Sequence, residues 1–376
     1  MAYLDHNASS PLRPAVVDAV GEALRLHGNP SSIHQDGRRC RAAMEDARDR
    51  IAALVDGRSE AVILTSGGTE ANALGLLGPG GLGVGTGGGD RARRVIVGAT
   101  EHPCILKAAP NAATIAVDHR GVVDLDHLES LLARESAPAV VGVMLANNET
   151  GVLQPVSMVA DLCRRHGAWF HCDAVQGPGR LAVSLENIGC DSLALSGHKL
   201  GAPAGVGALV LAPGREVAPI LRGGGQERGR RAGTENVLGT VGFGVACALV
   251  REEGSGEAAR CAILRDRLES QLRARFPALV VHGEGVDRLP NTSCLGLPGL
   301  EAQRVLMALD LKGVRIGAGS ACSSGSLAPS PVLLAMGLGK ATAKEAIRVS
   351  LGWSTTEADV DRFLDGFSAV ATRAMV

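Results

Sequence analysis

The stretch Ser192-Leu193-Ala194-Leu195-Ser196-Gly197-His198-Lys199 ends an apolar run with a lysine, and it is the most informative part of the chain. A short, continuous apolar run is typical of a buried β-strand. The lysine lies between that run and the small residues of 200–207, so a semi-buried position is predicted rather than a solvated one. Burial lowers the pKa of an amine and favours its neutral, nucleophilic form. An ordinary surface lysine would explain the stretch equally well when it is taken alone.

A second apolar run, Trp169-Phe170-His171-Cys172, ends on an acid, Asp173, and Gln176 follows. An acid at one strand end and a lysine at the next fit pyridoxal 5′-phosphate (PLP). The acid keeps the pyridine nitrogen protonated, and the lysine carries the cofactor aldehyde as a Schiff base. A helix-capping aspartate is the alternative for the acid. Together, Asp173 and Lys199 make PLP the cofactor that the sequence predicts.

Beyond residue 60, apolar strand-like runs alternate with amphipathic helical patterns. The predicted buried strands are residues 61–65, 94–98, 139–145, 169–172, 192–195 and 206–211. Continuous apolar strands separated by helices predict an α/β fold with a mostly parallel sheet covered on both faces. Ligands of such sheets bind beyond the carboxyl ends of the strands. Polar residues that could carry chemistry follow those strand ends: Thr69, His102, Asn148, Asp173 and Lys199.

The pattern changes after about residue 256, where short predicted strands and helices mix. Helices are predicted over residues 258–276, 302–312 and 356–374, and strands over residues 280–282, 291–297 and 346–352. A chain of 376 residues is also long for a single core. We therefore predict a large PLP-binding domain over residues 14–256 and a smaller α+β domain built from residues 1–13 and 257–376.

Composition and charge exclude several classes of protein. The chain is 45% apolar and 20% charged with a net charge of −1, so nothing favours nucleic-acid or membrane-surface binding. The N-terminus lacks a signal-peptide pattern and no run of about 18 apolar residues occurs, which predicts a cytoplasmic protein without a membrane span. Nine scattered cysteines without a C-x-x-C pair argue against a disulfide framework or a structural metal site.

The stretch Ser66-Gly67-Gly68-Thr69-Glu70 follows a predicted strand and opens a helix. The free N–H groups and the positive dipole end of a helix N-terminus bind phosphate dianions. Gly68 and Thr69 are therefore candidate phosphate ligands, and Ser196 would add a hydroxyl donor. An ordinary capped helix start is the alternative.

Two further side chains after strand ends could contact a cofactor or its substrate. His102 could stack on a pyridine ring and exchange protons with the substrate. The amide of Asn148 could contact the substrate or the phenolic oxygen of PLP. A loop histidine and an ordinary turn asparagine are the alternatives.

Cys322 lies in a segment of small residues, Gly317-Ala318-Gly319-Ser320-Ala321-Cys322-Ser323-Ser324-Gly325-Ser326. Such a segment cannot anchor itself in a core, so mobility is predicted, and a mobile thiol suits a nucleophile that reaches a site and leaves it. An incidental cysteine in a Gly/Ser turn is the alternative. Arg348 lies in a predicted strand, where a bidentate pair with an amino-acid carboxylate would compensate a fixed cation.

The segment 223–236 is polar, cationic and glycine-rich, and it contains Thr234. A solvated loop explains this composition. A loop that reaches toward anions in the site of a partner subunit explains it equally well.

Taken together, these residues resemble the cysteine desulfurases, PLP enzymes of fold type I in the aminotransferase class V group. The resemblance extends from Tyr3-Leu4-Asp5-His6-Asn7-Ala8 to Ser350-Leu351-Gly352 and includes residues 28–34, 66–70, 147–151, 171–176 and 196–199. The segment 320–326 is similar to the long catalytic loop of the family. Within the family, the chain is most similar to the nitrogen-fixation (NifS) type, because it ends soon after the last helix and lacks the tail of the IscS type.

The resemblance implies a PLP-dependent transferase fold: a mostly parallel seven-stranded sheet flanked by helices, with a smaller α+β domain. It implies a homodimeric enzyme that converts L-cysteine to L-alanine and leaves a persulfide on Cys322. The sulfur would pass to an iron–sulfur scaffold or another acceptor protein, with nitrogenase cluster assembly as the role of the NifS type. The only metal contact envisaged is that of an iron–sulfur cluster with Cys322.

The resemblance also assigns roles to single residues. Lys199 carries PLP and moves the substrate proton, Asp173 pairs with the pyridinium nitrogen, and His102 stacks on the ring as an acid and base. Gln176 contacts the phenolic oxygen. The phosphate is held by Gly68, Thr69, Ser196 and His198, with Thr234 from the other subunit. The substrate carboxylate is bound by Asn148, Arg348 and Asn29. One departure is Pro103, which stands where the family often has a second histidine.

Two alternatives remain open from the sequence. A selenocysteine lyase or an aminotransferase would share Lys199 and Asp173, although an aminotransferase needs no nucleophilic thiol at Cys322. A catalytically idle scaffold that binds sulfur-carrier proteins would need neither the lysine nor the acid.

Overall fold

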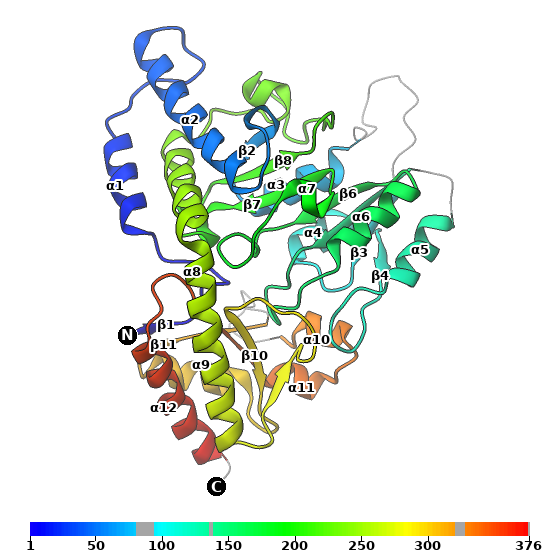
Figure 1. The fold of residues 1–376 in the computed structure, drawn as a ribbon, viewed down its shortest axis with the longest axis vertical. Helices are drawn as coiled ribbons and strands as arrows, with labels where there is room; N and C mark the ends of the chain where they lie inside the picture. The colour runs from blue at the N-terminus through cyan, green and yellow to red at the C-terminus, as the bar shows by residue number, and fades with distance from the viewer. Residues whose placement is uncertain (80–93, 135–137, 320–327, 375–376) are drawn as a thin grey trace.

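A seven-stranded sheet forms the framework of the larger core in the computed structural model, which describes residues 1–79, 94–134, 138–319 and 328–374 (Figure 1). Cys322 lies outside the described residues. The sheet order is β2-β8-β7-β6-β5-β3-β4. The strands are β2 (Val62–Thr65), β3 (Arg94–Gly98), β4 (Ala113–Ile115), β5 (Ala139–Met144), β6 (Trp169–Asp173), β7 (Ser192–Ser196) and β8 (Gly207–Leu211).

The sheet is mostly parallel, as predicted. Strands β4, β3, β5, β6 and β7 pair in parallel, and β8 is antiparallel to both β7 and β2. Strand β2 therefore runs in the same direction as β7. All six predicted strands are present, whereas the three-residue edge strand β4 was missed because it lacks a long apolar run.

Helices cover both faces of this sheet, which confirms the predicted α/β architecture. One face packs against α3 (Gly68–Leu77) and α4 (Pro103–Ala108). The other face packs against α2 (Gln35–Leu54), α5 (Leu125–Ala133), α6 (Val156–Arg165), α7 (Leu185–Ile188) and α8 (Val237–Arg275), and α1 (Pro14–Ala23) packs against α8. Short 3₁₀ turns form at η1 (Ser59–Ala61), η2 (Gly197–Lys199) and η3 (Gln226–Gly229).

A second hydrophobic core surrounds a four-stranded antiparallel sheet in the order β12-β13-β10-β9. Its strands are β9 (Val280–His282), β10 (Thr292–Gly296), β12 (Gly317–Ala318) and β13 (Ala346–Ser350). Strand β1 (Ala2–Tyr3) pairs in parallel with β11 (Val314–Arg315) beside it. The helices of this half are α9 (Ala302–Asp310), α10 (Pro331–Ala335), α11 (Lys340–Glu345) and α12 (Glu357–Ala374).

The long helix α8 corrects the predicted helix 258–276, because it begins 21 residues earlier, at Val237 instead of residue 258. Glycines in residues 239–256 weaken the helical pattern, yet they are needed for packing. A Cβ atom on Gly244 would lie 2.6 Å from Ala47 Cα. Helices α2 and α8 can therefore pack this closely only because residue 244 has no side chain.

Figure 1 shows α8 running along the molecule beside both cores. Phe243 belongs to the larger core and Leu264 to the smaller one. The predicted boundary between residues 256 and 257 falls inside this helix, and the division into residues 14–256 and the two outer segments stays a prediction. No helix of the described residues is long and apolar enough to cross a membrane.

Candidate active site

The carboxyl ends of the parallel strands meet at one edge of the large sheet, where a cavity of about 530 Å³ opens. The segments that follow β2, β3, β5, β6 and β7 all contribute to its wall, and β13 contributes from the smaller core. The predicted site residues that line it are Gly68, Thr69, His102, Asn148, Asp173, Gln176, Ser196, His198, Lys199 and Arg348. The strand directions therefore bring together side chains that are up to 280 positions apart (Gly68 to Arg348).

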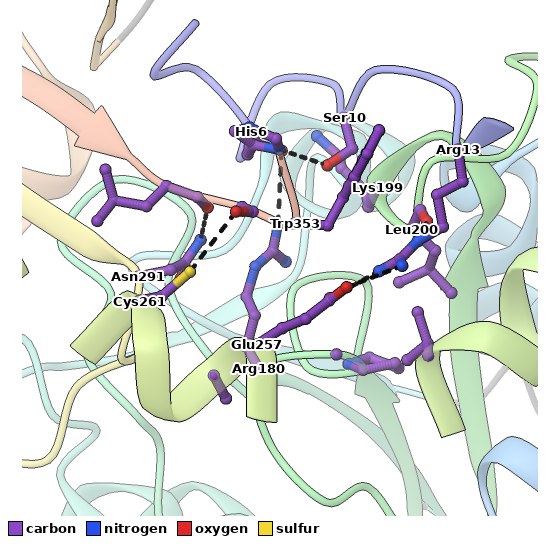
Figure 2. A pocket seen from close by; sticks show the side chains of 16 residues that line it. His6, Ser10, Arg13, Arg180, Lys199, Leu200, Glu257, Cys261, Asn291 and Trp353 are labelled. Carbon is purple, nitrogen blue, oxygen red and sulfur yellow. Dashed lines mark hydrogen bonds and ion pairs between the residues drawn. The ribbon is translucent and has the colours of Figure 1, made fainter. Parts of the chain in front are cut away.

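Lys199 ends the turn η2 directly after β7 and projects into this cavity. Its Nζ donates hydrogen bonds to the carbonyl oxygens of Asn7 (2.6 Å) and Ala8 (2.8 Å). On another side it borders a small cavity of about 30 Å³, next to Arg180 (Figure 2). Burial lowers the pKa of Lys199 to about 7, and the charges of Arg180 and Arg348 add to the effect. The amine is therefore substantially neutral near pH 7.

Asp173 is buried at the end of β6. Its Oδ2 accepts a hydrogen bond from Asn72 Nδ2 (2.7 Å), and its Oδ1 accepts one from the backbone N–H of Val175 (3.0 Å). Burial raises the pKa of the Asp173 carboxyl, while its hydrogen bonds lower it, as do His102 and Lys199 in their protonated forms. A cationic pyridinium nitrogen is the kind of partner that such a desolvated carboxylate needs.

His102 follows β3 and caps helix α4, since its Nδ1 accepts a hydrogen bond from the backbone N–H of Cys104 (3.2 Å). Desolvation against the cavity wall lowers the pKa of the imidazole, so the neutral ring carries its proton on Nε2. Pro103 occupies the first position of α4. A proline is favoured there because it has no N–H to leave unpaired, which explains its presence after His102.

The N-terminus of α3 opens at the cavity, where the sequence predicted an anion site. Gly67 is its N-cap residue at φ 151°, a conformation that favours glycine, and it offers no side-chain cap to the first turn. A Cβ atom on Gly68 would lie 2.9 Å from Val175 and 3.2 Å from Ser196, so only glycine leaves this approach open. The buried Ser196 Oγ has no hydrogen-bond partner among the described residues. An open helix end beside an unpaired hydroxyl fits the phosphate group of PLP.

Two other predicted contacts are already engaged within the protein. Gln176 donates from Nε2 to the Asn7 carbonyl (3.0 Å) and accepts from Arg180 at Oε1 (2.7 Å), which leaves its second amide hydrogen for a ligand. His198 Nδ1 lies 3.3 Å from Ser9 Oγ. Burial lowers the pKa of His198 to about 4, with the Lys199 charge adding to the effect, so its ring is neutral at pH 7.

Arg348 reaches the cavity from β13 and is buried. Its Nη2 pairs with Asp5 Oδ1 (2.7 Å), and its Nη1 donates to the backbone carbonyl of Asn148 (3.1 Å). The Nε atom is buried and has no partner among the described residues. A buried guanidinium with a spare donor suits the carboxylate of an amino acid.

Three predicted site residues do not meet at this cavity. Asn29 and Thr234 are exposed and do not line it within this chain, and Cys322 lies outside the described residues. The segment with Thr234 is nevertheless tied to the phosphate end, because Arg231 Nε pairs with Glu70 Oε1 of α3 (2.7 Å). The role of Thr234 in the site of a second subunit stays a prediction.

Two residues important for the site were missed in the sequence. Asn7 connects the two cores: its side chain donates to the Asn148 carbonyl (3.1 Å) and to Thr292 Oγ1 (2.9 Å). Nothing local reveals this role, because all its partners are distant in sequence. Asn72 holds Asp173, and here a signal existed: an asparagine interrupts the apolar run of α3 on its buried face.

Comparisons with known proteins agree with this geometry. The family model described as "Aminotransferase class-V" matches residues 2–363. The chain therefore belongs to the aminotransferase class-V family of PLP-dependent enzymes, which confirms the predicted fold class and cofactor.

Individual similar proteins indicate which members of this family the chain resembles. A cysteine desulfurase of Trichormus azollae is 38% identical over 390 residues, which cover 99% of this chain and 93% of that protein. A solved NifS-like protein from Rickettsia africae ESF-5 has a TM-score of 0.88 and 34% identity, with 99% of each chain covered. A solved complex of SspA with cysteine has a TM-score of 0.78 and 26% identity, over 95% of this chain and 100% of that one. Within the family, these relatives place the chain among the cysteine desulfurases.

Proposed function

We propose that the protein converts L-cysteine to L-alanine and leaves the sulfur as a persulfide on Cys322. The observation that carries the proposal is a single cavity lined by an amine of lowered pKa, Lys199, a buried carboxyl, Asp173, and a buried cation, Arg348. These are the groups needed to hold a PLP cofactor and the carboxylate of an amino acid.

The cavity residues would share the binding of PLP. The first turn of α3 with Ser196 would bind the phosphate, Lys199 would hold the aldehyde carbon covalently, and Asp173 would face the pyridine nitrogen. When bound, PLP supplies an electron sink that acidifies the Cα–H bond of the amino acid. The ε-amine of Lys199 would then move that proton, since its pKa of about 7 lets it both accept and release a proton at neutral pH.

Arg348 and Asn148 would orient L-cysteine through its carboxylate, with the side-chain sulfur toward the Cys322 segment. The Cys322 thiolate would attack that sulfur, so that a new S–S bond forms while the Cβ–S bond of the substrate breaks. The remaining three-carbon fragment takes up a proton and leaves as L-alanine. His102, neutral and proton-bearing at Nε2, would exchange protons with the substrate in these steps.

The partners and compartment follow from the same proposal. Thr234 is exposed away from the cavity of its own chain, which supports a homodimer in which it completes the phosphate site of the partner. The persulfide would pass to an iron–sulfur scaffold or another acceptor, including one for nitrogenase clusters. All eight cysteines among the described residues are free, which supports the reducing cytoplasm as the compartment.

The test is the turnover of L-cysteine by the PLP-loaded protein in the presence of a reductant. We expect L-alanine and sulfide in equal amounts, because each turnover releases one of each. A parallel assay with L-selenocysteine separates this activity from a selenocysteine lyase. Formation of pyruvate and ammonia, or transfer of the amino group to a keto acid, would contradict the proposal.

Arg348→Gln is expected to raise the KM for L-cysteine about 10- to 100-fold and to change kcat much less. A hydrogen bond to a charged group contributes about 1.5–3 kcal/mol, and uniform binding of the carboxylate affects KM. Steady-state alanine formation measures both constants. Arg348→Lys keeps the charge without the bidentate geometry, so its KM should lie between those of the unaltered protein and Arg348→Gln. Arg315→Gln, which removes an exposed cation of β11, serves as the control. An unchanged KM for Arg348→Gln would show that Arg348 does not bind the substrate carboxylate.

The rate at which added PLP bonds covalently to the apoprotein is expected to rise with pH up to about 7 and then level off. Only the neutral amine attacks the aldehyde, and Lys199 has a pKa of about 7 instead of the usual 10.5. Absorbance changes after mixing give the rate at each pH. The same series with N-acetyl-lysine controls for the ionisations of PLP itself. A rate that kept rising through pH 9, as for a free lysine, would mean that Lys199 is an ordinary amine.

A further inference from the structure

A chain of hydrogen bonds leads from the core of the large sheet to Asp173. Trp169 Nε1 lies 3.1 Å from Ser192 Oγ, which lies 2.9 Å from His171 Nδ1. His171 Nε2 lies 3.0 Å from Asn72 Oδ1, and Asn72 Nδ2 lies 2.7 Å from Asp173 Oδ2. All five side chains are buried. We call these five residues the Asp173 relay.

The chemistry of its members gives the Asp173 relay one direction. An ionised carboxylate can only accept, so Asn72 turns its N–H₂ group toward Asp173 and its Oδ1 toward His171 Nε2. The neutral imidazole then carries its proton on Nε2 and donates to Asn72 Oδ1. Burial lowers the pKa of His171 to about 3, which keeps this ring neutral. Nδ1 of His171 is left to accept from the hydroxyl of Ser192, which itself accepts from the indole N–H of Trp169, and these bonds hold the Asn72 amide with its N–H₂ group toward the Asp173 carboxylate.

The packing of α3 makes this arrangement specific to the sequence. A Cβ atom on Gly75 would lie 2.2 Å from His171 Nδ1, so the helix can pass over the imidazole ring only with glycine at this position. Asn72 lies three residues earlier, on the same face of the helix. Helix α3 therefore presents its N-terminus to the phosphate end of the cavity and Asn72 to Asp173.

We propose that Asn72, fixed by His171, is a positioning residue of the reaction: it orients the Asp173 carboxylate and keeps it ionised for the cofactor nitrogen. The inference rests on the proposed role of Asp173 in holding PLP. The Asn72 side chain bonds to Asp173, His171 and Cys104, so its effect on the reaction passes through Asp173.

The charges around Asp173 explain why such a donor is needed. Burial favours the protonated carboxyl of Asp173, whereas the hydrogen bonds from the Val175 N–H and from Asn72 favour the carboxylate. Burial raises the pKa of the nearby Glu101 carboxyl well above its usual range. Cys104, which accepts a weak hydrogen bond from Asn72 (3.4 Å), has its pKa raised to about 12 by burial and is neutral. The hydrogen bond from Asn72 therefore acts against the desolvation of Asp173.

The test compares Asn72→Leu, which keeps the branching at Cγ and removes the amide, with the unaltered protein. In the apoprotein, the infrared band of the Asp173 carboxyl is isolated by subtracting the spectrum of the same protein with Asp173→Asn. We expect the carboxyl to titrate at a higher pH in Asn72→Leu, and the dissociation constant of PLP, followed by fluorescence, to rise about 10- to 100-fold. The KM for L-cysteine should change little.

Two further variants separate positioning from folding. His171→Phe removes the donor to Asn72 and should shift both quantities in the same direction, whereas His171→Gln offers an amide donor and should restore most of the PLP affinity. Gln154→Leu removes another buried amide, which accepts from Val123 N–H (2.9 Å) and does not line the cavity, and is the matched control. It should lower the Tm without moving the Asp173 titration or the PLP affinity.

The proposal is overturned if Asn72→Leu and His171→Phe lower only the Tm. In that case the pH at which Asp173 titrates and the PLP affinity would both equal those of the unaltered protein. If Asn72→Leu does not fold, the His171 pair decides by the same two measurements. Neither measurement depends on turnover of cysteine. A protein that keeps these effects but releases no alanine would refute the proposed function and leave the role of Asn72 intact.

Discussion

The substitution Lys199→Ala is expected to abolish alanine formation from L-cysteine, with a loss of at least about 10³-fold, and to remove the absorbance band of covalently bound PLP. Lys199 is the lysine that lines the cavity among the described residues, and its amine serves both as the attachment point and as the proton carrier. Loss of a positioned acid–base group alone costs about 10²- to 10⁴-fold. The spectrum after reduction with borohydride distinguishes covalent from free cofactor.

The control for this substitution is Lys107→Ala, which removes an exposed lysine from the last turn of α4. It should retain both the absorbance band and the turnover. Lys199→Arg keeps a cation but cannot bond to the aldehyde, and should be as inactive as alanine. An unchanged absorbance band in Lys199→Ala would show that another amine carries the cofactor.

The substitution Cys322→Ala is expected to leave PLP bound with its normal absorbance and to lower sulfide release by at least about 10³-fold. A thiolate is the group that can take the substrate sulfur as a persulfide, and removing a covalent nucleophile has effects of this size or larger. Cys322→Ala should therefore keep the cofactor spectrum and lose the release of sulfide with a reductant. Lys199→Ala should lose both.

Other thiols do not replace Cys322 in this scheme. Cys104 lines the cavity, but burial raises its pKa to about 12, so it is protonated at neutral pH and a poor nucleophile. Cys163→Ala is the matched control, because this buried cysteine of α6 has a pKa raised to about 12 and lies in the core. It should keep full turnover. Normal conversion of cysteine to alanine by Cys322→Ala would remove this thiol from the mechanism.

The fold was largely predictable because its strands are continuous apolar runs. The runs at 94–98, 139–145 and 169–172 become β3, β5 and β6 within two residues at their ends. The N-terminal half of α8 was not predicted, since its glycines read as helix breakers in isolation. The helix tolerates them because α2 packs closely against them. This packing offsets the low helix propensity of glycine, and it exists only in the tertiary structure.

The candidate site was predictable where a reactive residue directly follows a strand. Lys199, Asp173 and His102 each stand at such a position, and the parallel sheet gathers strand ends at one edge whatever the details of packing. The partners that tune them could not be found in this way. Asn7 meets Lys199 across 192 positions, and Asn72 meets Asp173 across 101.

The sequence by itself therefore determined the architecture, the cofactor and the candidates for the reactive groups, because strand periodicity and the order of residues along strands are local properties. Only the tertiary structure decided the protonation and orientation of those groups. The lowered pKa of Lys199 and the one-directional hydrogen bonds to Asp173 depend on burial and on donors that come from separate elements. Desolvation and hydrogen-bond geometry arise only when those elements pack together.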